Sequence, residues 1–339
     1  MNAFNGERIL DALRHEYGIE AVEVTPLHLG ADADSTPHLA ETRDGVKYFA
    51  KLRRSFDPVS VAVARGLFEA GVTEVVAPLP TRTGALFTEC AGETLLVYPY
   101  VAGERGLEIP FTPSHWATLG GIVARVHAFK PPPELAAKLP QETFSNRWRS
   151  LVQNDLQRAA DEPFDDPAVQ ELAALFVEKR SELEELIDHT EKLASILRAR
   201  SHELVVCHTD LHGGNLLIDG DAIRVVDWDA PILALRERDL MFAGGGQGYL
   251  GLTAQEEERH FQRGYGVTPD PVALAYYRYE RVIQDLAAYW GEIQRPATSA
   301  ADREDCVRRV RANWIPGGTL ESARRADPTQ RGRFEISGA

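Results

Sequence analysis

Residues 205–217, VVCHTDLHGGNLL, place a cluster of polar groups between two apolar runs. A loop costs backbone entropy and buried polar atoms need partners, so this composition indicates a site rather than a core segment. Asp210 and Asn215 lie in this stretch, and Asp227 follows it in LLIDGDAIRVVDWD. Carboxylate and amide oxygens are the hard ligands that Mg²⁺ prefers. We therefore predict that Asn215 and Asp227 bind magnesium, and that Asp210 orients and deprotonates a hydroxyl group.

Far upstream, Lys51 interrupts the otherwise apolar pattern VKYFAKL. Such a lysine either extends into solvent at a sheet edge or binds phosphate inside a cleft. The three oxygen-bearing side chains downstream favour the phosphate interpretation. The alternation of His208, Asp210 and His212 is also compatible with the metal triad of a hydrolase. A zinc site of that kind would give Lys51 and Asp227 no role, so the hydrolase interpretation is disfavoured.

Two kinds of element must position these residues. Alternating and amphipathic patterns predict strands at 21–29, 37–42, 46–52, 85–90 and 94–101, with helices at 7–17 and 58–70. Helical patterns dominate afterwards, at 112–129, 144–159, 167–200, 253–264, 271–293 and 300–313. A turn at 219–220 predicts a hairpin whose closure brings Asp227 beside Asn215. The sequence thus predicts an α+β fold with a mainly antiparallel sheet lobe at 1–101, a helical lobe at 102–339, and a loose tail from Asp327.

Composition excludes several classes of partner. The formal net charge of −14 argues against a binder of nucleic acid, which needs a basic face, and it can attract a cationic ligand. No apolar run approaches the roughly 20 residues that span a bilayer, and the first residues do not resemble a secretory signal. The three cysteines are far apart, which favours a reducing cytoplasm. We expect a cytoplasmic protein, as a monomer or homodimer.

The words HTDLHGGN and VVDWD, with an upstream strand lysine, resemble the aminoglycoside phosphotransferase family, whose members fold like protein kinases. The helix pattern LGGIVARVHAF is similar to that family as well, and the resemblance spans Leu27 to Leu286. The late segment YYRYERVIQDLAAYW is most similar to the aminoglycoside 9-phosphotransferases, the spectinomycin kinases. The resemblance implies a bilobal kinase-like fold with a smaller sheet lobe and a larger helical lobe.

The resemblance also implies a role for each candidate residue. Asp210 becomes the catalytic base, Asn215 and Asp227 the magnesium ligands, and Lys51 the contact to the α- and β-phosphates of ATP or GTP. His208 is expected to pack beneath the catalytic loop. The hinge that offers backbone groups to the purine is expected at Tyr98, Pro99, Tyr100 and Val101.

Three features depart from the kinase pattern. The turn LGADADST, expected to cover the phosphates, holds one glycine and no G-x-G-x-x-G. The helix at 58–70 has Ser60 where a glutamate partner of Lys51 is expected, and Glu69 lies near its end, so the acidic partner of Lys51 is open. No A-P-E element is present, which argues against a kinase of protein substrates.

The expected function is the transfer of a γ-phosphoryl group to a hydroxyl of a small cationic aminocyclitol such as spectinomycin, which inactivates an antibiotic. Acidic side chains such as Asp155, Glu280 and Asp285 are candidates to hold its ammonium groups. One alternative is a kinase of another small metabolite, namely choline, homoserine, a sugar or a fructosamine. A non-catalytic nucleotide-binding regulator is disfavoured, because the base and both metal ligands are present.

Overall fold

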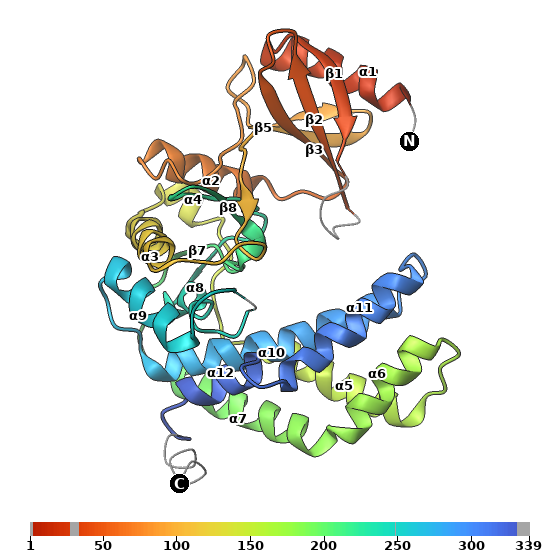
Figure 1. Ribbon diagram of the computed structural model, residues 1–339, viewed down its shortest axis with the longest axis vertical. Coiled ribbons are helices and arrows are strands. Elements are labelled where there is room, and N and C mark those ends of the chain that lie inside the picture. Colours follow the sequence, from red (N-terminus) through yellow and green to blue (C-terminus); the bar gives the residue numbers. More distant parts are fainter. Residues whose placement is uncertain (1–2, 28–33, 248, 331–339) are drawn as a thin grey trace. The chain divides into compact units, whose positions relative to one another are not determined.

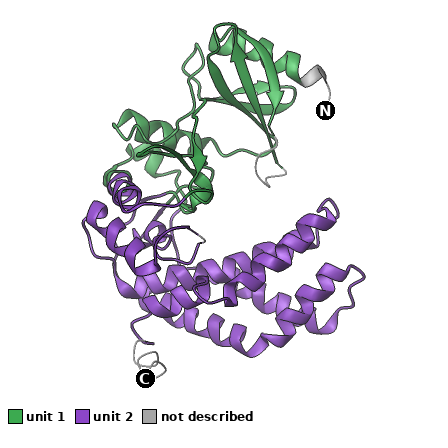
Figure 2. Cartoon of the chain, in the orientation of Figure 1, with its two compact units in different colours: residues 1–109, 125–140, 208–232 green, residues 110–124, 141–207, 233–339 purple. Residues whose placement is uncertain are grey.

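The computed structural model describes residues 3–27, 34–247 and 249–330. The chain folds as two compact units, shown in Figure 2. Unit 1 comprises residues 1–109, 125–140 and 208–232, and unit 2 comprises residues 110–124, 141–207 and 233–339. Both units are therefore built from segments that are distant in the chain. The lobe boundary that the sequence places at residue 101 stays a prediction.

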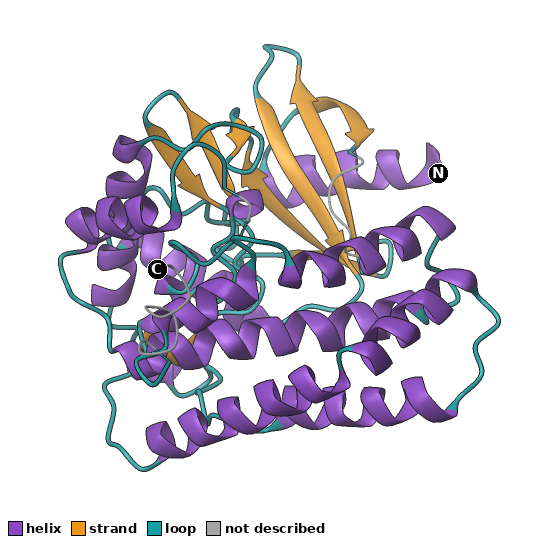
Figure 3. Ribbon diagram, turned by 60° about the horizontal axis from the view of Figure 1, so that its bottom comes forward, coloured by secondary structure: helices purple, strands orange, loops and turns teal. Residues whose placement is uncertain are grey.

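The N-terminal part of unit 1 is a five-stranded antiparallel sheet, with the strand order β1-β2-β3-β5-β4. Its strands are β1 (Ala21–Pro26), β2 (Ser35–Thr42), β3 (Lys47–Arg53), β4 (Thr88–Cys90) and β5 (Glu93–Pro99), drawn as arrows in Figure 3. The predicted sheet is confirmed, with β4 shorter than expected. The phosphate-covering turn expected at LGADADST falls largely outside the described residues. Strand β3 lies in the middle of the sheet, so Lys51 is anchored between Pro37 of β2 and Leu96 of β5.

Alternation along β3 divides its side chains between two faces. Ala50 and Leu52 are buried in an apolar cluster that includes Ile9 and Leu13. Helix α1 (Ala3–Ala12) and the π-helical turn η1 (Leu13–Tyr17) supply these last two residues and so pack against the sheet. Because successive strand residues point to opposite faces, Lys51 is directed away from this cluster.

Unit 1 also contains two helices and a second, smaller sheet. Helix α2 (Pro58–Glu69) begins after Asp57, whose carboxylate accepts a hydrogen bond from the Val59 amide at 2.9 Å. A three-stranded sheet has the order β6-β8-β9, from β6 (Glu104–Arg105), β8 (Leu216–Asp219) and β9 (Ala222–Val225). Strands β8 and β9 form the predicted hairpin. The short helix α4 (Pro133–Ala136) also belongs to unit 1.

Unit 2 is mainly helical and is organised around α10 (Pro271–Ile293), most of whose apolar residues are buried. The other elements are α5 (Arg147–Asp161), α6 (Pro167–Glu178), α7 (Arg180–Arg198), α8 (Glu237–Leu240), α9 (Ala254–Tyr265), α11 (Ala300–Arg311), η3 (Ala312–Trp314), α12 (Thr319–Ala326) and the strand pair β7 (Val205–Cys207) and β10 (Ile232–Ala234) (Figure 1). The helical pattern predicted at 167–200 is confirmed. It forms two helices that meet at Lys179, which is the C-cap of α6 and the N-cap of α7.

Helix α3 (Pro113–Ala128) begins in unit 2, where it crosses α9 at a contact between glycines. A Cβ atom at Gly264 would overlap the carbonyl oxygen of Ala117, and one at Gly120 would overlap the carbonyl oxygen of Phe261. Only glycine permits two helix backbones to approach this closely, because any side chain would force them apart. This close crossing explains why the pattern LGGIVARVHAF has a glycine at position 120.

The end of the described chain is packed more firmly than the sequence indicates. Asp327 is fully buried. Its carboxylate is 2.6 Å from Nε2 of His189 and accepts hydrogen bonds from the Tyr279 hydroxyl at 3.2 Å and the Thr329 amide at 2.8 Å. The expectation of a loose tail from Asp327 is therefore wrong at its start, because this carboxylate is tied to α7 and α10. Among the described residues, no helix is both long and apolar enough to cross a membrane.

Candidate active site

The loop that carries Asp210 is held by its own side chains. His208 is 1 % exposed, and its Nδ1 atom accepts a hydrogen bond from the Asp210 amide at 3.2 Å. The other ring nitrogen, Nε2, is then the protonated one and donates to the Val226 carbonyl at 2.9 Å. The ring also packs edge-on against Trp228, at 4.6 Å between centroids. The expected packing of His208 beneath the loop is confirmed.

Asn215 joins the loop of Asp210 to the segment that follows β9. Its Nδ2 atom donates to the backbone carbonyl of Asp210 at 2.9 Å and to the Asp210 carboxylate at 3.3 Å. Its backbone carbonyl accepts a hydrogen bond from the Val226 amide at 3.0 Å. The 3₁₀ turn η2 (Gly213–Asn215) thus lies beside the residue that precedes Asp227, and the predicted approach of Asn215 to the far end of the hairpin is confirmed.

Two residues of this region have a backbone that L-amino acids rarely adopt. Thr209 has φ 77° and Asp227 has φ 64°, both in the left-handed region. This conformation is a genuine outlier for a β-branched residue such as Thr209, whose hydroxyl donates to the Ala230 carbonyl at 3.1 Å. Such conformations persist only where the surrounding structure enforces them, and they concentrate at functional sites. Thr209 directly precedes Asp210, and Asp227 is itself a predicted site residue.

Lys51 lies against the segment that follows β9. Its ammonium group is 3.2 Å from Oδ1 of Asp227 and 3.1 Å from Oδ2 of Asp229, and its side chain is 14 % exposed. Arg53, two residues along β3, binds the same Asp229 oxygen at 2.5 Å. The phosphate interpretation required Lys51 to converge with Asp227, and the structure brings them together. Asp229 and Arg53 were not identified from the sequence, although each lies two residues from a predicted site residue.

The electrostatics of this cluster favour an ionised Asp227. Partial desolvation opposes ionisation, but the Lys51 ammonium and the neighbouring polar groups outweigh it, so the pKa of Asp227 is lowered from its ordinary value. An ionised carboxylate at this position is a competent metal ligand. In Asn215 the amide nitrogen is used by Asp210, which leaves the amide oxygen as the ligand atom. A carboxylate and an amide oxygen fit magnesium, which takes its remaining ligands from water and phosphate.

Of the four predicted hinge residues, Tyr98 and Pro99 end β5, and Tyr100 and Val101 follow it. The Tyr98 ring is 6.3 Å from the Phe49 ring, and the Tyr100 amide donates to the Lys47 carbonyl at 3.3 Å. Just beyond, Gly103 has φ 152°, and a Cβ atom there would lie 2.9 Å from the Ile218 carbonyl oxygen. The chain after residue 101 therefore passes close to β8, near the loop of Asp210. That Tyr98, Pro99, Tyr100 and Val101 bind a purine stays a prediction.

The three acidic candidates for the acceptor site all have partners within unit 2. Burial raises the pKa of Asp155 to about 6, with Arg158 opposing the shift from 3.9 Å. Asp285 pairs with Arg281 at 3.0 Å. Glu280 is almost fully buried and binds Arg149 at 2.5 Å. These contacts account for the three carboxylates as parts of the helical packing.

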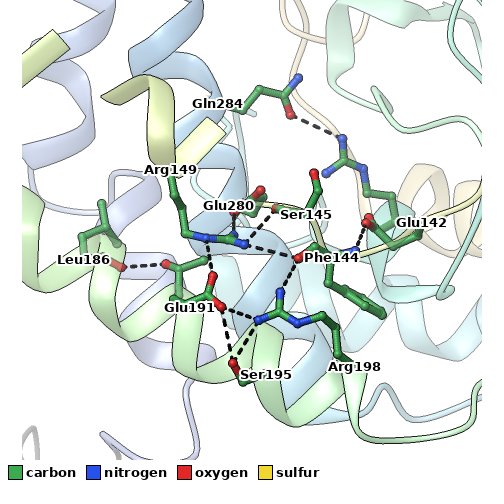
Figure 4. Close-up of polar contacts among 12 residues, drawn as sticks. Glu142, Phe144, Ser145, Arg149, Leu186, Glu191, Ser195, Arg198, Glu280 and Gln284 are labelled. Atoms are coloured by element: carbon green, nitrogen blue, oxygen red, sulfur yellow. Dashed lines mark hydrogen bonds and ion pairs between the residues drawn. The ribbon is translucent and has the colours of Figure 1, made fainter. Parts of the chain in front are cut away.

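Figure 4 shows the network around Arg149, which is 2 % exposed. The guanidinium also binds Glu191 at 3.1 Å and the Ser145 carbonyl at 2.8 Å. Arg198 donates to the Phe144 carbonyl at 2.6 Å, and Phe144 has a left-handed φ of 52°. Arg149 and Arg198 thus hold a strained connection that enters α5.

Comparison with known proteins gives results that agree with this geometry. Residues 23–277 match the model of a family described as "Phosphotransferase enzyme family" (APH). Protein StrN of Streptomyces griseus is 26 % identical over 278 residues, which cover 78 % of this chain and 80 % of StrN.

Solved structures extend the similarity over nearly the whole chain. The spectinomycin phosphotransferase APH(9)-Ia, in complex with ADP and spectinomycin, has 27 % identity and a TM-score of 0.87, covering 96 % of this chain and 99 % of that one. Its AMP-bound complex has 26 % identity and a TM-score of 0.83, covering 94 % and 98 %. The kinase-like fold class that the sequence implied is therefore confirmed.

Proposed function

We propose, since the chain belongs to the phosphotransferase enzyme family, that it transfers the γ-phosphoryl group of ATP or GTP to a hydroxyl of an aminocyclitol of the spectinomycin type. The observation that carries the proposal is the cluster of Lys51, Asp227 and Asp229 beside the loop of Asp210 and Asn215. The similarity to spectinomycin phosphotransferase over 96 % of the chain supports the choice of acceptor. The net charge of −14 suits a substrate that carries ammonium groups.

In the proposed reaction the protein positions and stabilises charge. The Asp210 carboxylate accepts the proton of the acceptor hydroxyl as its oxygen forms a bond to the γ-phosphorus. The bond from that phosphorus to the β,γ-bridging oxygen breaks, and the nucleoside diphosphate leaves. Lys51 donates hydrogen bonds to the α- and β-phosphates, and backbone groups of the hinge residues 98–101 bind the purine. Magnesium, held by Asn215 and Asp227, would neutralise charge on the phosphates.

The remaining features of the proposal concern the setting of the enzyme. Cys90, Cys207 and Cys306 are buried and form no disulfide, which suits a reducing compartment and supports a cytoplasmic location. We retain the division into a sheet lobe at 1–101 and a helical lobe at 102–339, and a monomer or homodimer, as parts of the proposal. If the acceptor is the antibiotic, the enzyme confers resistance by inactivating it.

A panel of acceptors, tested for release of nucleoside diphosphate in a coupled assay, examines the choice of substrate. We expect turnover with spectinomycin, and little or none with choline, homoserine, ribose or a fructosamine, because the similarity is to a spectinomycin enzyme. The phosphorylated product is identified by mass spectrometry. Turnover confined to one of the other acceptors would contradict the aminocyclitol assignment. Nucleotide binding without turnover on any acceptor would favour a regulator.

Replacing Asp227 by alanine tests the metal site. We expect magnesium to tighten nucleotide binding to the unmodified protein and to have no such effect on Asp227→Ala, because the variant lacks the carboxylate ligand. Titration calorimetry with ATP, in excess magnesium and in EDTA, measures both affinities. Asp221→Ala, an exposed acid on the turn of the same hairpin, serves as the control and should retain the magnesium effect. A variant that still responds fully to magnesium would remove Asp227 from the site.

A further inference from the structure

Lys51 and Arg53 form a pair of cations on one face of β3. They are two residues apart on a strand, so they share the face opposite the buried Leu52. Their side chains are each 14 % exposed. Strand β3 is held by neighbours on both sides, which gives the two cations a fixed spacing. Two partly buried cations at this spacing need anionic partners.

Asp229 is the acid that binds both cations. One of its oxygens, Oδ2, lies 3.1 Å from the Lys51 ammonium and 2.5 Å from Nη1 of Arg53. Asp227 contacts Lys51 as well, at 3.2 Å. Because the proposed function assigns Asp227 to magnesium, Asp229 is the described partner of Lys51 to which that function assigns no role.

Helix α2, where a kinase is expected to carry the glutamate partner of this lysine, supplies no carboxylate to it. The Ser60 hydroxyl donates back to the Asp57 carbonyl at 2.8 Å. Glu69, the last residue of the helix, binds Arg65 at 2.7 Å on the protein surface. The partner of Lys51 thus comes from the segment after β9 and not from α2.

We propose that Asp229, braced by Arg53, is the positioning residue for Lys51 and replaces the helix glutamate of other kinases. The inference rests on the proposed function of Lys51 as the phosphate contact. Its role differs from that of Asp227, because Asp229 acts through the lysine and not through the metal. By binding Arg53 at the same oxygen, Asp229 ties the Lys51 ammonium to a second fixed point of β3, and this limits the orientations that the ammonium adopts.

The variant Asp229→Asn tests this role through three measurements. We expect kcat to fall by roughly ten- to a hundredfold, because a misplaced Lys51 stabilises the transition state less well. The affinity for ATP in EDTA should not fall, because the substitution removes an anion from a site that binds phosphate. Magnesium should still tighten ATP binding, in contrast to its effect on Asp227→Ala. Asp221→Asn, at the exposed turn of the hairpin, is the matched control and should resemble the unmodified protein in all three.

A double substitution asks whether Asp229 acts through Lys51. If it does, Lys51→Met/Asp229→Asn should be no slower than Lys51→Met alone, because the positioned group is already absent. Additive losses would overturn the proposal, as would an unchanged kcat in Asp229→Asn. Loss of the magnesium effect would make Asp229 a metal ligand, and weaker ATP binding in EDTA would indicate a general structural role, so either result also overturns it.

The test remains distinct from that of the proposed function. Turnover is measured with the acceptor found in the panel or, if every acceptor fails, as hydrolysis of ATP by water. Failure of the panel contradicts the acceptor assignment, whereas the response of Asp229→Asn judges the positioning role. Asp229→Glu, which keeps the charge, should recover part of the lost kcat and so separates the effect from misfolding.

Discussion

Asp210→Ala should lower kcat by about 10²–10⁴-fold, because the variant lacks the general base for the acceptor hydroxyl. The affinity for nucleotide should barely change. The stronger of the two hydrogen bonds that Asn215 donates reaches the Asp210 backbone at 2.9 Å, and this bond survives the substitution. The loop and Asn215 therefore keep their places while the Asp210 carboxylate is lost.

Steady-state kinetics and calorimetry on the same preparation separate the two effects of Asp210→Ala. Asp219→Ala, an exposed acid at the start of the hairpin turn, provides the control and should keep both kcat and nucleotide affinity. Full activity of Asp210→Ala would exclude the residue from the chemical step. An equal loss of nucleotide affinity would show that its main contribution is to hold the loop together.

Arg149→Met should lower the free energy of unfolding by about 3–5 kcal/mol, because it leaves the buried Glu280 without its partner. Burial raises the pKa of Glu280 to about 7 although Arg149 opposes the shift. Without the arginine, the folded-state pKa rises further above the unfolded value, so the folded protein binds the proton more tightly. Stability of the variant should then fall as pH rises from about 4.5 through 7, and the deficit should be smallest at the acidic end.

Urea denaturation of three variants measures how much the Arg149–Glu280 pair contributes to the free energy of unfolding. The double variant Arg149→Met/Glu280→Met should recover much of the loss, because apolar side chains of similar volume replace a buried ion pair at little cost. Arg147→Met, at an exposed arginine of the same helix whose guanidinium lies over the Trp148 ring, should cost about 1 kcal/mol or less. A double variant as unstable as the single one would mean that the contacts of Arg149 to the Phe144 and Ser145 carbonyls, rather than Glu280, account for its contribution.

Most of the candidate site residues could be predicted from the sequence because they lie close together along the chain. Asp210 and Asn215 lie on one loop, and the turn at 219–220 fixes the return of the hairpin toward Asp227. Lys51 could be identified because a charged side chain in an apolar strand must either reach solvent or have an anionic partner. These signals depend on short stretches of chain, where propensity and alternation determine the local structure.

Contacts between residues that are distant in the sequence could not be predicted in this way. Asp229 lies 178 residues from Lys51, and its place in the motif VVDWD did not indicate that it would pair with this lysine. Glu280 was considered for the acceptor site because its partner Arg149 is 131 residues away. Asp327 was assigned to a loose tail for the same reason, since His189 and Tyr279 are distant in sequence. Each of these acids is defined by a partner that only the tertiary fold supplies.

The interleaved make-up of unit 1 has a consequence for how the protein is made. Its five-stranded sheet is complete by residue 99, whereas the segment with Asp227 and Asp229 begins at residue 208, about a hundred residues later. At a synthesis rate of about 5–20 residues per second, several seconds pass between synthesis of the sheet and synthesis of that segment. During this interval Lys51 and Arg53 have neither aspartate, so the nascent domain is more cationic at this face than the finished enzyme.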